Sequence, residues 1–151
     1  MSQPAVNPYL KTKIMTASPQ ELRLMLYDGA IKFCHQAHAA VEQDDFESSY
    51  ANLIRAQKIV LELSTSLKRD VDVNIYDKLA ALYTYIYRKL VDANMNRTIE
   101  EIDEAIRLLE YERQTWQMLM QKIAEEAGRA GEDASDDSAR QTAISTYSQS
   151  A

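Results

Sequence analysis

The stretch between Ala30 and Ala127 contains neither glycine nor proline, and this absence limits the fold more than any other feature of the sequence. Proteins built from β-strands need frequent turn residues, so the stretch is incompatible with an all-β fold. The whole chain of 151 residues has only 3 glycines and 3 prolines. We therefore expect long uninterrupted helices in one all-α domain.

Apolar side chains and helix-capping residues predict where these helices lie. Ser18 precedes Glu21 by three residues with Pro19 between them, which is typical of a capping box and predicts a helix from Pro19. Apolar residues at helical spacing then predict helices over residues 19–43, 46–66, 73–93 and 98–127. Asp44 or Asp45 caps the second of these helices, and Thr98 with Glu101 begins the last. Short polar links between them favour an antiparallel up-down four-helix bundle.

The ends of the chain differ from this bundle, which we place at residues 19–127. Residues 1–18 contain prolines and read as an extended arm or a short helical turn, but they also carry Tyr9, Leu10 and Ile14. A disordered tail rarely has so much apolar surface, so we expect the arm to fold back onto the body. Residues 128–151 are rich in Gly, Ser, Asp and Ala, and we expect them to form a disordered tail.

Gly29 stands out inside the first predicted helix. Spacings of three and four residues place Leu22, Leu26, Gly29 and Phe33 on one face of the helix. Glycine costs a helix about 1 kcal/mol relative to alanine. Its presence on an apolar face therefore indicates that another helix approaches closely there.

The predicted helices carry more apolar residues than one stripe requires. Ile54 and Leu61 flank the main row of residues 46–66, Tyr85 and Tyr87 leave the row of residues 73–93, and Leu108 leaves that of the last helix. These residues either widen the core face or form a groove for an amphipathic helix. The pattern alone leaves both interpretations open.

No group of residues supports catalysis or cofactor binding. The sequence Cys34-His35-x-x-His38 invites a metal or phosphorelay interpretation. Metal-binding bundles, however, use Glu-x-x-His pairs, and Lys32 and His35 occupy the positions where those glutamates would be. A phosphorylated histidine needs neighbouring cations, and only Lys32 is near. We expect a protein without enzymatic activity, metal or cofactor.

Charge and cysteine content exclude further classes. The net charge of −6 and the lack of a basic cluster argue against a nucleic-acid partner. No apolar run is long enough to insert into a membrane. The single cysteine cannot form an internal disulfide and no signal sequence is evident, so we expect a cytoplasmic protein.

Three sequence features together resemble those of a known family. They are the run TASPQELRLMLYDGAI that begins at Thr16, the aromatic Tyr9 upstream, and the Arg113-x-x-Trp116 element in the last helix. The chain resembles the FliS family of flagellin-specific export chaperones from about Asn7 to Ala127. It differs between residues 68 and 74, where many members have a glycine-containing turn.

The resemblance implies a function and a set of partners. It implies a chaperone that binds the C-terminal segment of flagellin, prevents premature polymerisation and delivers subunits to the flagellar export gate. We expect partner binding through the residues named above (Tyr9, Leu10, Ile14, Ile54, Leu61, Tyr85, Tyr87 and Leu108), with the arm covering part of the groove. Ser18, Glu21, Gly29 and Trp116 are expected to be structural, and a homodimer is a further expected state of the free protein. The alternative is a generic adaptor bundle that binds another amphipathic helix.

Overall fold

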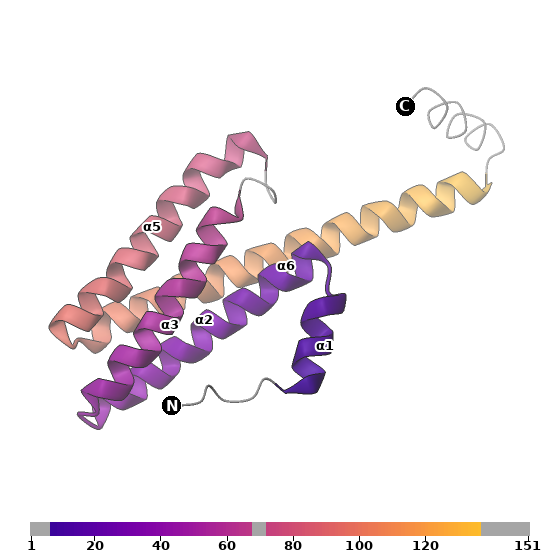
Figure 1. The fold of residues 1–151 in the computed structure, drawn as a ribbon. Helices are drawn as coiled ribbons and strands as arrows, with labels where there is room; N and C mark the ends of the chain where they lie inside the picture. The colour runs from indigo at the N-terminus through magenta and orange to yellow at the C-terminus, as the bar shows by residue number, and fades with distance from the viewer. Residues whose placement is uncertain (1–6, 68–71, 137–151) are drawn as a thin grey trace. The chain divides into compact units, whose positions relative to one another are not determined.

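The computed structural model describes residues 7–67 and 72–136, and these residues form helices without any strand. The helices are α1 (Pro8–Thr16), α2 (Pro19–Glu42), α3 (Phe46–Thr65), α5 (Val73–Asn96) and α6 (Ile99–Asp136) (Figure 1). The chain separates into two compact units, Met1–Gln114 and Thr115–Ala151. The all-α prediction is confirmed.

Capping side chains begin the helices of the first unit. The Ser18 hydroxyl accepts a hydrogen bond from the Glu21 amide at 3.1 Å, and the Glu21 carboxylate accepts one from the Ser18 amide at 3.3 Å. Asp45, rather than Asp44, caps α3 through the amide of Ser48 at 3.1 Å. Asp44 instead has a left-handed conformation in the preceding turn, with φ of 56°.

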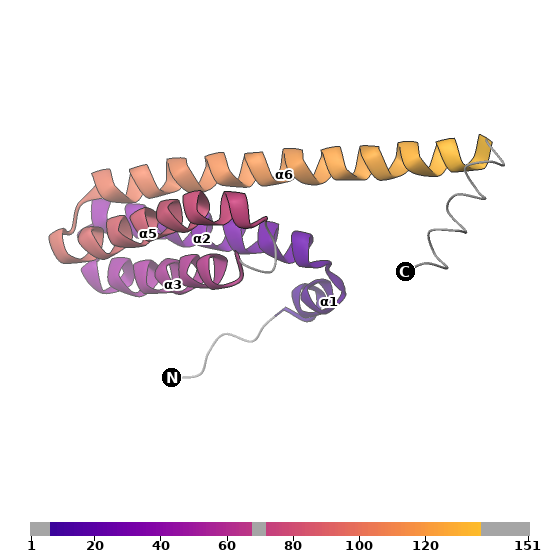
Figure 2. The ribbon, with the colours of Figure 1, turned by 90° about the horizontal axis from the view of Figure 1, so that it is seen from above.

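Helix α3 packs between α2 and α5 in the first unit. The two views agree that α2, α3, α5 and the first part of α6 lie side by side (Figures 1 and 2). Fully buried apolar side chains on all four helices form the core, among them Tyr27, Cys34, Leu53, Val60, Leu63, Tyr83, Ile86, Leu90, Ile102 and Leu109. Within the described part of the chain, no helix is both long and apolar enough to span a bilayer.

Two helices continue beyond their predicted ends. Helix α5 reaches Asn96 rather than residue 93 and stops at Arg97, whose left-handed backbone has φ of 56°. Helix α6 continues through Gly128 to Asp136, so the expectation of disorder from residue 128 is wrong for residues 128–136. Side chains 121–131 of this second unit are exposed. The predicted tail over residues 137–151 lies outside the described residues.

Candidate functional site

A hollow of about 670 Å³ lies where α1 faces α2 and the end of α3, and we call it the α1 hollow. Leu10 and Ile14 lie four residues apart on one face of α1 and contribute to its wall. Each of these two side chains is 42% exposed. The remaining lining residues are half apolar and half polar, and they come from α2, with two from α3 and its cap: Pro19, Gln20, Leu22, Arg23, Met25, Leu26, Glu62 and Ser66.

Tyr9 is separated from the other two arm residues predicted to bind a partner. Its side chain is 75% exposed, and it is not among the residues lining the α1 hollow. The Asn7 side chain accepts a hydrogen bond from the Tyr9 amide at 2.9 Å, which starts α1. The arm thus presents Leu10 and Ile14 to the hollow, and Tyr9 lies outside it.

A second, smaller hollow of about 130 Å³ lies between α3 and α5, and we call it the α5 hollow. It brings together Leu61 and Tyr87, which the sequence predicted as binding residues on separate helices. Leu61 is 52% exposed at its edge. The other lining residues are Val60, Ser64, Tyr83 and Thr84.

The other predicted binding residues line neither of these hollows. Ile54 on α3 and Leu108 on α6 are half-buried. Tyr85 is 42% exposed, and its hydroxyl donates a hydrogen bond to Glu104 on α6. Lys89 also joins this group, with its Nζ 3.6 Å from a Glu104 oxygen and 5.2 Å from the centre of the Tyr85 ring. Tyr85 therefore links α5 to α6 through its polar end.

The buried polar residues around Arg23 were missed by the sequence analysis. Arg23 is 2% exposed, and its guanidinium donates hydrogen bonds to the Leu63 carbonyl at 3.0 Å, the Tyr83 hydroxyl at 3.1 Å and the Ser66 hydroxyl at 3.2 Å. The hydroxyls of Tyr27 and Tyr83 are hydrogen-bonded to each other. Burial raises the pKa of both tyrosines, so both hydroxyls stay protonated.

A periodic signal for Arg23 existed in the sequence. The buried row of α2 is Arg23, Tyr27, Ala30, Cys34 and Ala37, which repeats at spacings of three and four residues. The predicted row of Leu22, Leu26, Gly29 and Phe33 is one residue away and only half-buried. An arginine and two alanines weigh little in a search for large apolar residues, which explains the miss.

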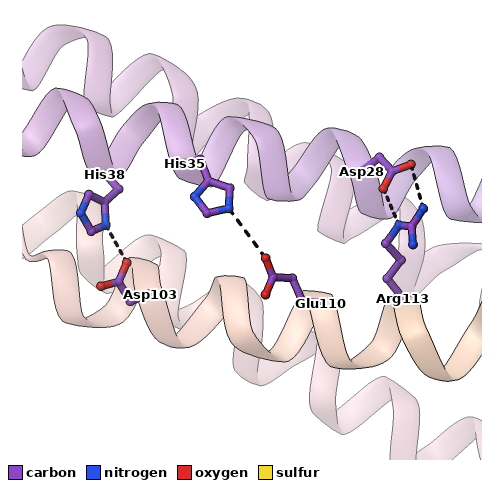
Figure 3. Close-up of polar contacts among 6 residues, drawn as sticks. All are labelled: Asp28, His35, His38, Asp103, Glu110 and Arg113. Carbon is purple, nitrogen blue, oxygen red and sulfur yellow. Dashed lines mark hydrogen bonds and ion pairs between the residues drawn. The ribbon is translucent and has the colours of Figure 1, made fainter.

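Three polar pairs connect α2 to the first part of α6, as Figure 3 shows. Arg113 Nε donates to Asp28 Oδ1 at 2.5 Å, so this arginine, which lies between Leu109 and Trp116 at helical spacing, pairs with α2. His38 Nδ1 lies 2.6 Å from Asp103 Oδ1. His35 Nε2 lies 3.7 Å from Glu110 Oε1, with both side chains more than half exposed.

We expect the stabilising contribution of His38 to depend on pH. Its hydrogen bond with Asp103 is the largest cause that raises its pKa above 6.5; slight burial opposes this rise, and Glu42 supports it. A raised histidine pKa stabilises the fold below the unfolded value and loses this effect as pH rises through the folded value. His38→Gln should therefore lower the melting temperature at about pH 5.5 and leave it nearly unchanged at about pH 8.5. Because the pair is partly exposed, the loss should stay below about 1 kcal/mol.

The matched control is His35→Gln, one turn earlier on the same helix. The His35 side chain is 60% exposed against 29% for His38, and its carboxylate partner is farther away. At about pH 5.5, His35→Gln should lower the melting temperature less than His38→Gln does. A His38→Gln variant that melts like wild type at the lower pH would contradict the role of the Asp103 pair.

Two further residues singled out by the sequence, Cys34 and Trp116, are buried. Cys34 is buried, and burial raises the pKa of its thiol to about 12, so it is not an activated nucleophile. Among the described residues, no three His, Cys, Asp or Glu side chains gather so that they could hold a metal ion. Trp116, in the second unit, is 7% exposed.

Comparisons with known proteins agree with the motifs. Residues 1–123 match the family described as flagellar protein FliS. The flagellar secretion chaperone FliS of Bacillus subtilis is 37% identical over 118 residues, covering 76% of this chain and 87% of the relative. The chaperones of the same name from Campylobacter jejuni and Salmonella typhimurium are 30% and 29% identical, covering 74% and 80% of this chain and 88% and 90% of the relatives. The chain belongs to the FliS family of flagellar secretion chaperones.

Proposed function

We propose that this protein is a cytoplasmic export chaperone that binds the C-terminal segment of flagellin. Binding would keep flagellin from polymerising early and assist its delivery to the flagellar export apparatus. The observation that carries the proposal is the α1 hollow, an apolar site partly walled by the N-terminal helix in a member of a secretion-chaperone family. An amphipathic helix placing its apolar face into such a groove is a common mode of peptide recognition.

The proposal assigns a role to each part of the chain. Residues 19–127 form the four-helix body that carries both hollows, residues 1–18 form a removable cover, and the region from 128 onward takes no part in binding. Leu61 and Tyr87 at the α5 hollow offer a second anchor for the same ligand. Contact of the loaded chaperone with the export gate, and a homodimer of the free protein, belong to the same proposal through the family resemblance.

The cover must be weak enough for a ligand to displace it. Full burial of a leucine or isoleucine side chain is worth about 1.5 to 3 kcal/mol, and Leu10 and Ile14 remain partly exposed in the α1 hollow. Helix α1 has 9 residues, and an isolated helix of that length is marginal in water. A longer flagellin segment with more apolar anchors therefore outcompetes α1.

Co-purification tests the proposal directly. The chaperone should retain full-length flagellin and fail to retain flagellin that lacks about its last 40 residues, a length that spans about 60 Å as helix. Retention of the truncated flagellin would favour the alternative of a generic adaptor.

A pair of charge substitutions locates the binding surface. Leu61→Asp at the α5 hollow should weaken flagellin binding by at least about tenfold, since it puts a charge where the bound segment would bury an apolar side chain. Met118→Asp is the matched control, because Met118 is 62% exposed and lines neither hollow. Equal affinities of the two variants in calorimetry would remove the α5 hollow from the site.

A further inference from the structure

A buried hydrogen bond connects a residue that lines the α1 hollow to a residue that lines the α5 hollow. Arg23 lines the α1 hollow and Tyr83 lines the α5 hollow. These two side chains are joined by the hydrogen bond from Arg23 Nη2 to the Tyr83 hydroxyl, 3.1 Å long and buried. Each residue is at most 2% exposed. A single buried hydrogen bond therefore joins the wall of one hollow to the wall of the other.

Contacts around this hydrogen bond fix the position of Tyr83. The Arg23 guanidinium carbon lies 5.5 Å from the centre of the Tyr83 ring and 5.9 Å from that of Tyr27. Tyr27, also on α2, is hydrogen-bonded through its hydroxyl to the Tyr83 hydroxyl. The position of the Tyr83 ring thus depends on α2 as well as on α5, its own helix.

We infer that the packing of α1 against α2 controls whether the α5 hollow is open. The Arg23–Tyr83 hydrogen bond transmits this effect. While α1 is in place, Leu10 and Ile14 close one side of the α1 hollow and limit how much bulk water reaches the α2 surface that holds Arg23. A hydrogen bond from a guanidinium is stronger in such a low-dielectric environment than in contact with water. When α1 leaves, water reaches the guanidinium, the hold on Tyr83 weakens, and the α5 hollow opens.

This inference rests on the proposed role of α1 as a cover, and it adds an order of events. A ligand helix that displaces α1 first would find the second hollow already loosened. The two anchoring sites are then positively coupled, because the first binding step contributes to the opening that the second requires. Arg23 and Tyr83 act as positioning residues in this scheme, because the buried hydrogen bond between them links the two walls.

Hydrogen exchange of the full-length chain tests the coupling. Leu10→Ala with Ile14→Ala should raise the amide exchange of residues 60–64 and 83–87 by about fivefold, the low end of typical coupling between sites. In a Tyr83→Phe background, exchange at these residues should already be raised, and the α1 substitutions should add nothing. The inference would be overturned if the α1 substitutions and Tyr83→Phe raised exchange additively. It would also be overturned if the α1 substitutions left exchange at residues 60–64 and 83–87 unchanged.

Ser66→Ala provides the matched control for general loosening of the core. It removes another hydrogen bond of Arg23, at 3.2 Å, but leaves the bond to Tyr83 intact. The α1 substitutions should still raise exchange at the α5 hollow in this background. Loss of coupling in Ser66→Ala would overturn the specific role of Tyr83.

The α1 substitutions should also raise amide exchange at residues 22–26, most of which line the α1 hollow. No change there would refute the role of α1 as a cover rather than the coupling between the two hollows.

Discussion

Replacing Arg23 by alanine should lower the free energy of unfolding by about 3 kcal/mol, because it removes one partner from a buried set of polar and charged groups. The Leu63 carbonyl, the Tyr83 hydroxyl and the Ser66 hydroxyl would lose the donor that now reaches them. Buried groups without partners cost about 1 to 3 kcal/mol each, although part of that is recovered by water entering the space left by the side chain. Urea unfolding followed by circular dichroism measures the loss.

The loss in Arg23→Ala should grow with pH because of Glu112. This residue is 8% exposed, and burial raises the pKa of its carboxyl while the charge of Arg23 opposes the rise. A raised carboxyl pKa stabilises the fold below the unfolded value of 4.5 and loses this effect as pH rises through the folded value. Without Arg23 the pKa of Glu112 rises further, so the penalty at about pH 8 exceeds that at about pH 5.

Glu112→Gln combined with Arg23→Ala is the control for this pH dependence. The double variant lacks the buried carboxyl, so its stability deficit relative to Glu112→Gln alone should be the same at both pH values. An Arg23→Ala protein as stable as wild type would contradict the structural role of the buried cluster. A stability deficit of Arg23→Ala that is the same at both pH values would contradict only the role assigned to Glu112.

Gly29→Leu should lower the free energy of unfolding by between about 1 and 3 kcal/mol through overpacking. A Cβ atom built at Gly29 would lie 3.2 Å from Ile59 Cδ1, so α2 and α3 approach closely at this point. The additional atoms of leucine would extend further into the space that Ile59 occupies. Thermal melts compare the variant with wild type.

Gly29→Ala separates overpacking from helix propensity. Ile59 Cδ1 is the end of a flexible side chain and can move by a few tenths of an ångström to admit one methyl group. Alanine also favours a helix by about 1 kcal/mol relative to glycine. The alanine variant should therefore melt at or slightly above the wild-type temperature. A leucine variant that melts like the alanine variant would show that α3 does not restrict this position.

The helix starts were predictable because they depend on neighbouring residues. The Ser18–Glu21 box and the Asp45 cap are local hydrogen bonds, and both begin helices near the predicted positions. The end of α6 was not predictable from the change in composition at Gly128. A cost of about 1 kcal/mol for each of Gly128 and Gly131 does not break a helix whose neighbouring residues favour helix formation. Only proline, at about 3 kcal/mol, would have been a reliable stop.

The candidate site was only partly predictable because it depends on register between helices. Periodicity identified Leu61 and Tyr87 as surplus apolar residues, but nothing local indicated that they line one hollow. The Arg23–Tyr83 hydrogen bond joins residues 60 positions apart, and the packing of α2, α3 and α5 decides whether they meet. Tyr9 and Leu10 are adjacent in sequence, yet only Leu10 lines the α1 hollow, because Leu10 and Ile14 share one face of the helix α1 and Tyr9 lies on another.

Calorimetry with the isolated C-terminal segment of flagellin tests most directly whether α1 and flagellin compete for one hollow. Three proteins are compared: wild type, Leu10→Ala with Ile14→Ala, and Tyr9→Ala as the control on the exposed face of α1. A cover lowers apparent affinity by the fraction of time that the site is open, so the double variant should bind more tightly than wild type. Tyr9→Ala should bind as wild type does. Weaker binding by the double variant would instead make Leu10 and Ile14 part of the ligand site, and unchanged binding would remove α1 from the mechanism.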